Sequence, residues 1–484
     1  MLFVMRHLYI FLLFLLFVMP RSYAQQQGIS LEECFRIAAT NNLSILQKQQ
    51  AVITRQYQYQ ASRRAVLPKV DLLGGYTYLG DPIKINLQSV REGIVTGTAQ
   101  QNVDAANRVF HEITGSDLSP DAQKAIYQSA ENVINAVYPN DNPTLSEQQY
   151  FTAGLSVHMP IYLGGKLHAA RAVAGRQLES GKLNLQFVQD QVSFAIATQY
   201  IEILYLNSML RKQEQLVDAF EQTKENATAL VKNEILPPYQ AHWANVALSQ
   251  ARSGLHRFML EKENAVLTLQ QLLGTDSTLT VSDTLQKADF LLPVSPSDEW
   301  ESNTSYQWLE AKTAEAESLV KVSRSLSMPN VFGLANYQFL RKDLPVITPP
   351  WMIGVVFQWN IFSGFENGRH VEAAKSLVKE SELLAQEKKD DLQWQIRMAQ
   401  NKLQVFREEM GTLDAARNEA AITTDMVRKR MANQLASVKD VNDALKVQLE
   451  AEKAYYTSVL AYNLAVAAYL NMTGKPKTIA TYLQ

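Results

Sequence analysis

The stretch FTAGLSVHMPIYLGGKLHAARAVAG, residues 151–175, changes from the repeat of a strand to the repeat of a helix within a few residues. Up to Ile161, apolar and polar residues alternate, as they do in a strand with one apolar face. Beyond Gly164 and Gly165, mostly apolar residues, with a few polar interruptions, recur at alternating spacings of four and three from Val192 to Val231, which indicates a helix packed lengthwise on another helix. The stretch therefore predicts a strand, a glycine junction and a long helix.

The same pattern occurs a second time further along the chain, which is the signature of an internal repeat. Shifted by 200, Gly164 falls on Gly364. Upstream the offset becomes 261, so that Pro68 falls on Pro329. Each copy reads, in order, as helix, strand, outer loop, strand and long helices. The predicted fold class is therefore mixed α+β, with four strands and unusually long coiled-coil helices.

The duplication divides the chain into five predicted segments. They are a signal peptide over 1–24; a first repeat over 25–275, with strands near 68–80 and 150–162 and long helices over 166–274; a linker over 276–300; a second repeat over 301–475, with strands near 329–340 and 351–362 and long helices over 366–473; and a C-terminal tail over 476–484.

The N-terminal segment, 1–24, predicts export. Arg6 precedes an apolar run from Leu8 to Val18, and residues 22–24 (SYA) supply small residues at the positions that a signal peptidase reads. The run is roughly half of the ~20 apolar residues that a helix needs to cross a bilayer. We therefore interpret the segment as a cleaved signal rather than as a membrane anchor.

The remaining chain has a balanced composition. Removing the signal takes away Arg6, Arg21 and no acid, which leaves 44 basic against 48 acidic residues and a net charge of −4. Nothing in this balance favours nucleic acid. Cys34 is the one cysteine, so there is no disulfide framework, and we expect it to be a small core residue. No other stretch is long and apolar enough for a spanning helix, so any membrane crossing must use strands.

The first outer loop, residues 81–149, is much longer than its counterpart in the second repeat, and the excess accounts for the change of offset from 261 to 200. Ser119, Pro120 and Asp121 form a helix-start signal, and apolar residues from Ile126 to Val137 follow at helical spacing. We interpret the loop as an ordered insertion that caps or narrows one mouth of the molecule. A disordered loop is the alternative.

Four strands with one apolar face cannot stand alone in a membrane, because open edges leave unpaired N–H and C=O groups in hydrocarbon. A closed barrel needs at least about eight strands, so several copies must assemble. Two sets of residues follow from the strand pattern. The membrane-interface aromatics are Tyr76, Tyr150, Tyr162, Tyr337, Trp351, Trp359 and Phe362, and the pore-facing residues are Thr77, Ser156, His158, Gln338 and Gln358. A soluble sandwich with these aromatics in its core is the alternative.

The order of these pieces resembles the TolC-like outer membrane efflux proteins. The resemblance rests on the opening ISLEECFRIAATNNLSILQKQQ, the strand starts LPKV and MPNV, the junctions IYLGG and IFSGF, and the ending YNLAVAAYLNMTG. It implies a homotrimer in the bacterial outer membrane, with a twelve-stranded barrel and helices that extend through the periplasm. It also implies a periplasmic adaptor, an inner-membrane pump of RND or ABC type, and the passive export of drugs, metals or proteins.

The resemblance carries one site over to this chain. Members of the family constrict the periplasmic entrance with a helix that bears two aspartates three residues apart, and SVKDVNDALK, residues 437–446, has Asp440 and Asp443 in that place. Such spacing puts both on one helix face, and six carboxylates in a trimer would favour cations. Two solvated surface acids beside Lys439 and Lys446 are the alternative.

Some members lock this entrance with a tyrosine and an arginine, but Met431 and Ala436 stand at those positions here. Arg428 or Arg430 is a possible substitute.

No enzyme is predicted. The histidines lack metal-ligand spacing, and Gly164-Gly165 lacks the pattern of a phosphate loop. GLSVH, residues 154–158, is not a nucleophile elbow. The sequence therefore predicts no catalytic residue, cofactor or metal site. A periplasmic coiled-coil scaffold or adhesin, and an uptake channel, remain as alternative functions.

Overall fold

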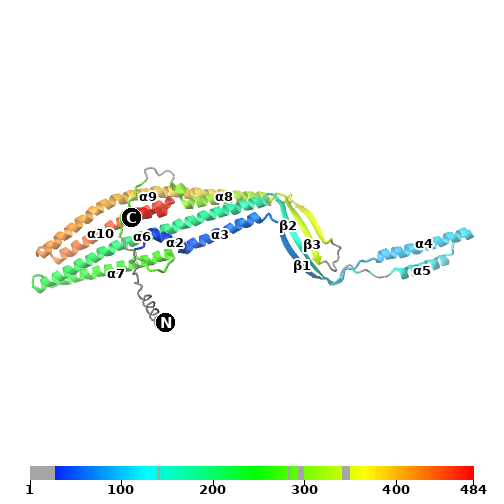
Figure 1. The fold of residues 1–484 in the computed structure, drawn as a ribbon, viewed down its shortest axis with the longest axis horizontal. Helices are drawn as coiled ribbons and strands as arrows, with labels where there is room; N and C mark the ends of the chain where they lie inside the picture. The colour runs from blue at the N-terminus through cyan, green and yellow to red at the C-terminus, as the bar shows by residue number, and fades with distance from the viewer. Residues whose placement is uncertain are drawn as a thin grey trace, which may run out of the picture. The chain divides into compact units, whose positions relative to one another are not determined.

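The computed structural model describes residues 28–138, 142, 144, 147–281, 284–292, 299–340 and 349–483. The predicted signal peptide lies outside these residues. The chain divides into two units (Figure 1). The helical unit comprises residues up to Arg63, His168–Ser323 and all residues from Glu366, and the sheet unit comprises Arg64–Leu167 and Arg324–Phe365.

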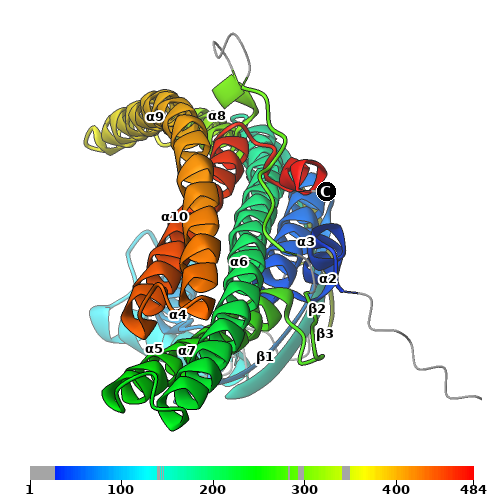
Figure 2. The same ribbon diagram turned by 90° about the vertical axis from the view of Figure 1, so that its left-hand side faces the viewer.

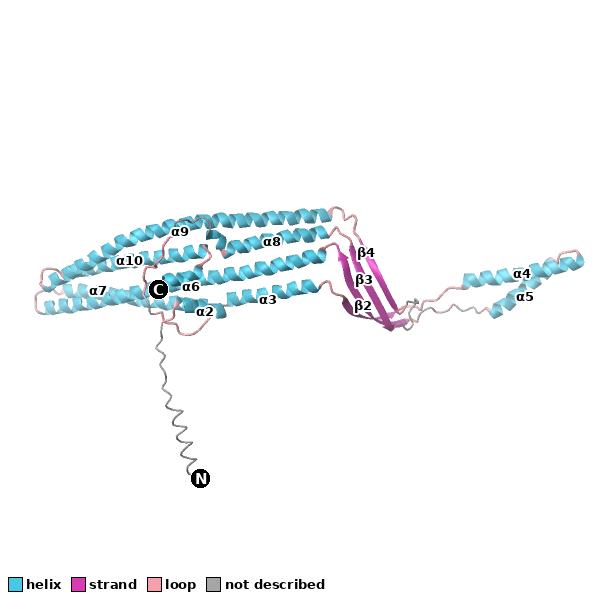
Figure 3. Ribbon diagram, turned by 45° about the horizontal axis from the view of Figure 1, so that its top comes forward, coloured by secondary structure: helices cyan, strands magenta, loops and turns pink. Residues whose placement is uncertain are grey.

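The helical unit is built on four long helices. Both α6 and α9 have 67 residues, and α7 and α10 have 35 each; at 1.5 Å per residue the longer pair spans about 100 Å. The helices run side by side (Figure 3). The bounds are α2 Leu31–Asn41, α3 Leu43–Arg64, α6 Lys166–Lys232, α7 Tyr239–Leu273, η1 Glu299–Ser302, α8 Thr304–Ser325, α9 Glu366–Ala432, α10 Val438–Met472 and η2 Pro476–Tyr482.

The core of this unit forms two clusters of buried side chains. The larger joins α2, α6, α7, α9, α10 and η2, and includes Ile201 and Leu269, both fully buried. The smaller lies near the α6–α7 and α9–α10 turns and includes Phe220 and Val438. Cys34 is fully buried in the larger cluster, as predicted, and burial raises the pKa of its thiol to about 12.

The two repeats agree in their backbone as well as in their sequence. Glu234, after α6, and Gln434, after α9, occupy equivalent positions and both adopt left-handed φ values, 59° and 62°. In each case the next residue donates its amide to a carbonyl in the last turn of the helix, Ile235 to Leu230 and Leu435 to Arg430. This is the Schellman pattern that ends a helix, so both long helices stop by the same device.

A buried asparagine joins the short and long helices of each repeat. Asn42 donates to the carbonyl of Leu272 at the end of α7, and its Oδ1 accepts from two amides at the start of α3. Asn303, its counterpart in the second repeat, donates to the carbonyl of Met472 at the end of α10 and accepts from two amides at the start of α8. Each side chain therefore caps one helix and holds the end of another.

Replacing Asn303 with alanine is expected to destabilise the helical unit by about 2–4 kcal/mol, because it removes a helix cap and the side-chain donor to the partly buried Met472 carbonyl. Thermal unfolding followed by circular dichroism in detergent measures this loss. Asn303→Asp keeps the accepting oxygen and should fall between the wild type and the alanine variant. An alanine variant as stable as the wild type would show that the joint carries no stability.

The linker and the C-terminal segment pack on the long helices. Asn207 of α6 donates to the carbonyl of Val281, and Asn463 of α10 accepts from the amide of Ala288. The ring of Phe290 packs on that of Tyr482 in η2, with centroids 5.2 Å apart. The described parts of the linker are therefore held by side-chain amides along the long helices.

The sheet unit contains one antiparallel sheet in the order β1-β2-β3-β4. Its strands are β1 Lys69–Tyr78, β2 Gln149–Leu163, β3 Asn330–Leu340 and β4 Trp351–Gln358. The register aligns Leu72, Leu155, Tyr337 and Trp351 in one row across all four strands. Partners in antiparallel strands share a face, so the alternation read from the sequence produces one continuous apolar face.

The strand–helix junctions need glycine for two reasons. Gly164 and Gly165 have φ values of 58° and 81°, in the left-handed region. A Cβ on Gly164 would also collide with the side chain of Met328. In the second repeat Gly364 has a φ of 61°, but the next residue, Phe365, takes 65° without being glycine. The predicted junction residues therefore sit in the same turn in both repeats.

The fourth strand is shorter than predicted. It ends at Gln358, whereas the pattern of the sequence extends it to residue 362. The partner strand β3 begins at Asn330, directly after Pro329, which has no N–H to donate. The indole of Trp359 instead donates to the carbonyl of Ser327, 3.1 Å away. Trp359 and Phe362 thus belong to the turn that follows the sheet.

The long loop between β1 and β2 contains a helical hairpin, α4 Gln88–Thr114 and α5 Pro120–Val137. The Ser119 hydroxyl accepts from the amide of Ala122, as the predicted cap requires. The prediction of an ordered, partly helical insertion is confirmed for the described residues, which do not form the disordered loop considered as its alternative. Its first helix, α4, was not predicted.

Candidate functional site

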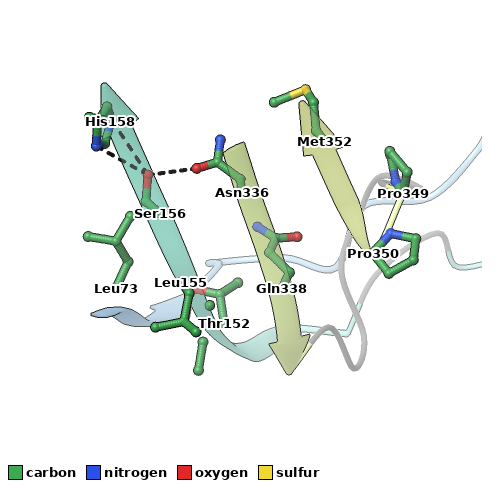
Figure 4. Close-up of a pocket in the computed structure, with 12 residues that line it drawn as sticks. Leu73, Thr152, Leu155, Ser156, His158, Asn336, Gln338, Pro349, Pro350 and Met352 are labelled. Atoms are coloured by element: carbon green, nitrogen blue, oxygen red, sulfur yellow. Dashed lines mark hydrogen bonds between the residues drawn. The ribbon is translucent and has the colours of Figure 1, made fainter. Parts of the chain in front are cut away.

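The polar face of the sheet carries a hydrogen-bonded cluster that spans three strands (Figure 4). Ser156 on β2 is 3% exposed and donates to Asn336 Oδ1 on β3 at 2.6 Å. His158 Nδ1 lies 3.5 Å from Asp71 Oδ2 on β1. These residues meet because the register pairs Asp71 with Ser156 and Ser156 with Asn336.

This cluster contains a serine, a histidine and an aspartate but lacks the geometry of a catalytic triad. Both ring nitrogens of His158 lie 3.5 Å from Ser156 Oγ, beyond the ~2.6–3.2 Å over which a base takes a proton. The serine hydrogen is already committed to Asn336. The cluster can exchange hydrogen bonds with water or a polar solute, which is the chemistry of a wetted surface.

A hollow of about 440 Å³ opens on this face. Three of the five predicted pore-facing residues line it, namely Ser156, His158 and Gln338, whereas Thr77 and Gln358 lie on the same face but outside the hollow. The apolar part of its wall was not predicted. The full lining is Leu73, Thr152, Ala153, Gly154, Leu155, Ser156, His158, Asn336, Gln338, Pro349, Pro350 and Met352.

The predicted interface aromatics divide between the faces. Tyr76, Tyr337 and Trp351 are on the apolar face and at least half exposed. A register shift after Pro160 pairs Tyr162 with Val331, which also lies on that face. Tyr150 pairs with Thr77 and so lies on the polar face. This corrects the prediction for Tyr150: the neighbouring residue, Phe151, lies on the apolar face, so Tyr150 lies on the opposite one.

The α9–α10 turn holds the two predicted aspartates, both exposed. Asp440 is part of a capping box at the start of α10: its Oδ2 accepts from the backbone amide of Ser437 at 2.8 Å and from its hydroxyl at 2.7 Å. The backbone and side-chain hydrogen bonds from Ser437 hold the pKa of Asp440 below its usual value, and Lys439 and Arg430 act in the same direction. Asp443 is one turn further along α10.

The two arginines near this turn have different partners. Arg428 Nη2 donates to Gln222 Oε1 of α6 at 2.6 Å, which links the α9–α10 hairpin to the α6–α7 hairpin. Arg430 Nη2 donates to the carbonyl of Leu435 within its own turn, at 3.3 Å. Figure 2 shows the two hairpins as separate pairs, α6–α7 in green and α9–α10 in orange and red. Of these two arginines, Arg428 makes a link between them.

A second polar link lies further from the turns and was missed by sequence reasoning. Glu452 of α10, with a side chain only 10% exposed, accepts from Lys212 Nζ of α6 at 3.1 Å. Its other carboxylate oxygen faces Arg417 Nη1 of α9 at 3.9 Å. Arg417 also bonds Asp414 and lies 4.0 Å from the ring centroid of Tyr455. A cavity of about 230 Å³ adjoins Lys212 and Glu452.

Two further kinds of feature are absent from the described residues. None of their helices combines the length and apolar character that a membrane-crossing helix requires. They also contain no group of three or more His, Cys, Asp or Glu side chains that could hold a metal ion.

Comparison with known proteins gives one family and several structures. Residues 128–275 match the family model described as outer membrane efflux protein. A search of curated proteins gives no match.

Several solved structures of outer membrane proteins share this fold. The Campylobacter jejuni CmeC outer membrane channel aligns with a TM-score of 0.71 at 15% identity, over 92% of this chain and 86% of that one. CusC, whose structures concern folding and transmembrane channel formation, gives 0.72 at 14% identity over 94% and 95%. The outer membrane protein VceC from Vibrio cholerae gives 0.68 at 14% identity over 92% and 96%. The likeness therefore covers nearly the whole chain, both repeats included.

Proposed function

We propose that this chain is an outer membrane efflux protein, the family whose model matches its residues 128–275, and that it is the exit duct of a tripartite efflux or type I secretion system. In this role it hydrolyses nothing. It receives substrates from an inner-membrane pump, of RND or ABC type, through a periplasmic adaptor and carries them across the periplasm and the outer membrane.

The observation that carries this proposal is an open-edged sheet with one exposed apolar face. Among the described residues β1 pairs only with β2, and β4 only with β3. The apolar face is exposed, with Leu72 72% and Ile353 74% accessible. Open edges are not tolerated in hydrocarbon, and three copies would give twelve strands and close them. The proposed assembly is a homotrimer with this face toward outer membrane lipid and the polar face toward the pore.

The proposed direction follows from chain order. In each repeat both strands of a hairpin connect to long helices at the same end, while the connections 79–148 and 341–350 join the strands at the other. The long helices α6, α7, α9 and α10 of a trimer would all leave its barrel on one side, the periplasm. The α6–α7 and α9–α10 turns would then form the entrance, with Asp440 and Asp443 as its acidic ring and Arg428 as its lock.

Replacing Arg428 with alanine is expected to loosen the entrance, because it removes the hydrogen bond to Gln222 between the two hairpins. Because both side chains are exposed, this bond contributes about 1 kcal/mol, so the population of open entrances should rise by about fivefold. Single-channel recording in planar bilayers would detect the larger open population as longer or larger openings. Arg430→Ala is the matched control, and an equal effect of both variants would contradict the assignment.

Two experiments test the proposed function itself. Detergent extraction of outer membranes should give heat-modifiable trimers, whereas a soluble monomer would instead support a periplasmic scaffold. Deletion of the gene should increase drug sensitivity or abolish secretion of a protein. Slower growth on a particular nutrient, with neither of those defects, would support an uptake channel instead.

A further inference from the structure

The α4–α5 hairpin of the first repeat has almost no core of its own. None of the 18 residues of α5 is buried, and α4 buries only Val95, Ala99 and Val103. Burying a side chain of this size stabilises a fold by up to about 1.5–3 kcal/mol, whereas ordering one residue costs about 1–2 kcal/mol. Two helices of this length are therefore not held together by these contacts alone.

The apolar side of α5 is wider than the surface that α4 covers. Ile126, Ala130 and Ile134 are half-buried between the helices, but Val133 is 62% and Val137 71% exposed. On a helix, Val133 and Val137 are one turn apart and continue the face that carries Ile126 and Ala130. An amphipathic helix with part of its apolar face uncovered requires a second surface to pack on.

The hairpin is attached to its sheet by short, paired connections. Nine residues separate β1 from α4, and eleven separate α5 from β2. The two connections are joined by a backbone hydrogen bond from Leu79 to Gln148 and by a bridge between Lys84 and Thr144. Nine residues span at most about 30 Å, so the hairpins of one assembly would all be confined near the same rim.

The next inference rests on the proposed trimer. We propose that the α4–α5 hairpins of three copies pack on one another through the exposed face of α5. They would form a six-helix bundle that narrows the outer opening. The diameter of the proposed barrel matches that of the proposed bundle. Twelve strands spaced about 4.8 Å apart and tilted by about 40° close at a diameter of roughly 25 Å, and six helices of about 10 Å form a ring of similar size. The tether makes the local concentration of hairpins about millimolar or higher.

Charge argues against an anionic lipid surface as the partner of the hairpin. Residues 88–137 contain six acidic residues and three basic ones, Arg91, Arg108 and Lys124. A net charge of −3 opposes binding to an anionic membrane surface, which basic clusters favour. Val133 and Val137 carry no charge, and convergence of the three α5 helices on the threefold axis of a trimer would bury both residues in every copy.

Cysteine cross-linking in outer membrane preparations tests this bundle. The natural Cys34 is fully buried, so Val133→Cys introduces the one accessible thiol of the described residues. Mild oxidation should link two of the three copies into a disulfide dimer on a non-reducing gel. Gln128→Cys is the control, because its exposed position lies about 140° around α5 from Val133, and it should react at least about tenfold more slowly.

The outcomes separate this inference from the proposed function. Trimers that cross-link through Val133→Cys and not through Gln128→Cys support the bundle. Trimers in which neither variant cross-links, or in which both do so equally, overturn the bundle and leave the exit duct standing. A preparation that contains only monomers overturns both.

Discussion

Replacing Glu452 with alanine is expected to destabilise the helical unit by about 3–5 kcal/mol, the usual cost of removing one partner of a buried ion pair. The carboxylate joins three helices, through Lys212 of α6 and Arg417 of α9. Without it, Lys212 loses its acid partner in a partly buried seam, whereas Arg417 keeps Asp414. The seam already contains a cavity, so little packing exists to compensate. Chemical denaturation of the detergent-solubilised protein measures the loss.

The double variant Glu452→Met with Lys212→Met is the matched control. It replaces the pair by side chains of similar length, and such exchanges are often neutral or stabilising. We expect it to recover most of the stability lost in Glu452→Ala. If the double variant is as unstable as the single one, the loss comes from packing at this site rather than from an unpaired charge.

The pair also bears on opening of the entrance. Glu452 and Arg428 both link the α9–α10 hairpin to α6, at different distances from the turns. In the proposed channel these two links resist separation of the hairpins. The stable double methionine variant should therefore conduct more than the wild type, which distinguishes a conformational role of the pair from a purely stabilising one.

Most of the fold was predictable because its signals are periodic and occur twice. The apolar row through Leu72, Leu155, Tyr337 and Trp351 follows from strict alternation in four strands, and the ends of α6 and α9 follow from an offset of 200. The end of β4 was not predictable in this way. The alternation of the sequence continues to Phe362, but the last pair of the ladder joins Gln358 to Asn330, the first residue of β3.

The site was less predictable because its contacts join distant residues. Ser156 and His158 were found from alternation alone, but their partners depend on a register between strands that lie far apart in the sequence. Asp440 was identified through the family resemblance, yet Ser437 precedes it by three positions, which is a local capping signal. The link from Glu452 to Lys212 joins the two repeats, and no spacing in the sequence indicates it.

The two aspartates of the α9–α10 turn are expected to act unequally. Asp440 is tied to Ser437 and holds the start of α10, whereas Asp443 is exposed beyond the capping box. Because the folded pKa of Asp440 is lowered, its contribution to stability is present above the unfolded pKa of about 4 and is lost as pH falls through the folded value. The entrance turn should therefore loosen below about pH 4.

Asp443→Asn is expected to weaken divalent-cation block of the channel by about a hundredfold, because a charge at short range in water-like surroundings contributes about 1 kcal/mol per carboxylate and a trimer would present three. Asp440→Asn should weaken block as well, but should also lower the pH-dependent stability of the turn, which Asp443→Asn leaves unchanged. Conductance and cation preference in planar bilayers, with and without divalent ions, measure the first effect. If a variant that carries both Asp440→Asn and Asp443→Asn has the conductance and the divalent-cation block of the wild type, these two residues do not line the entrance.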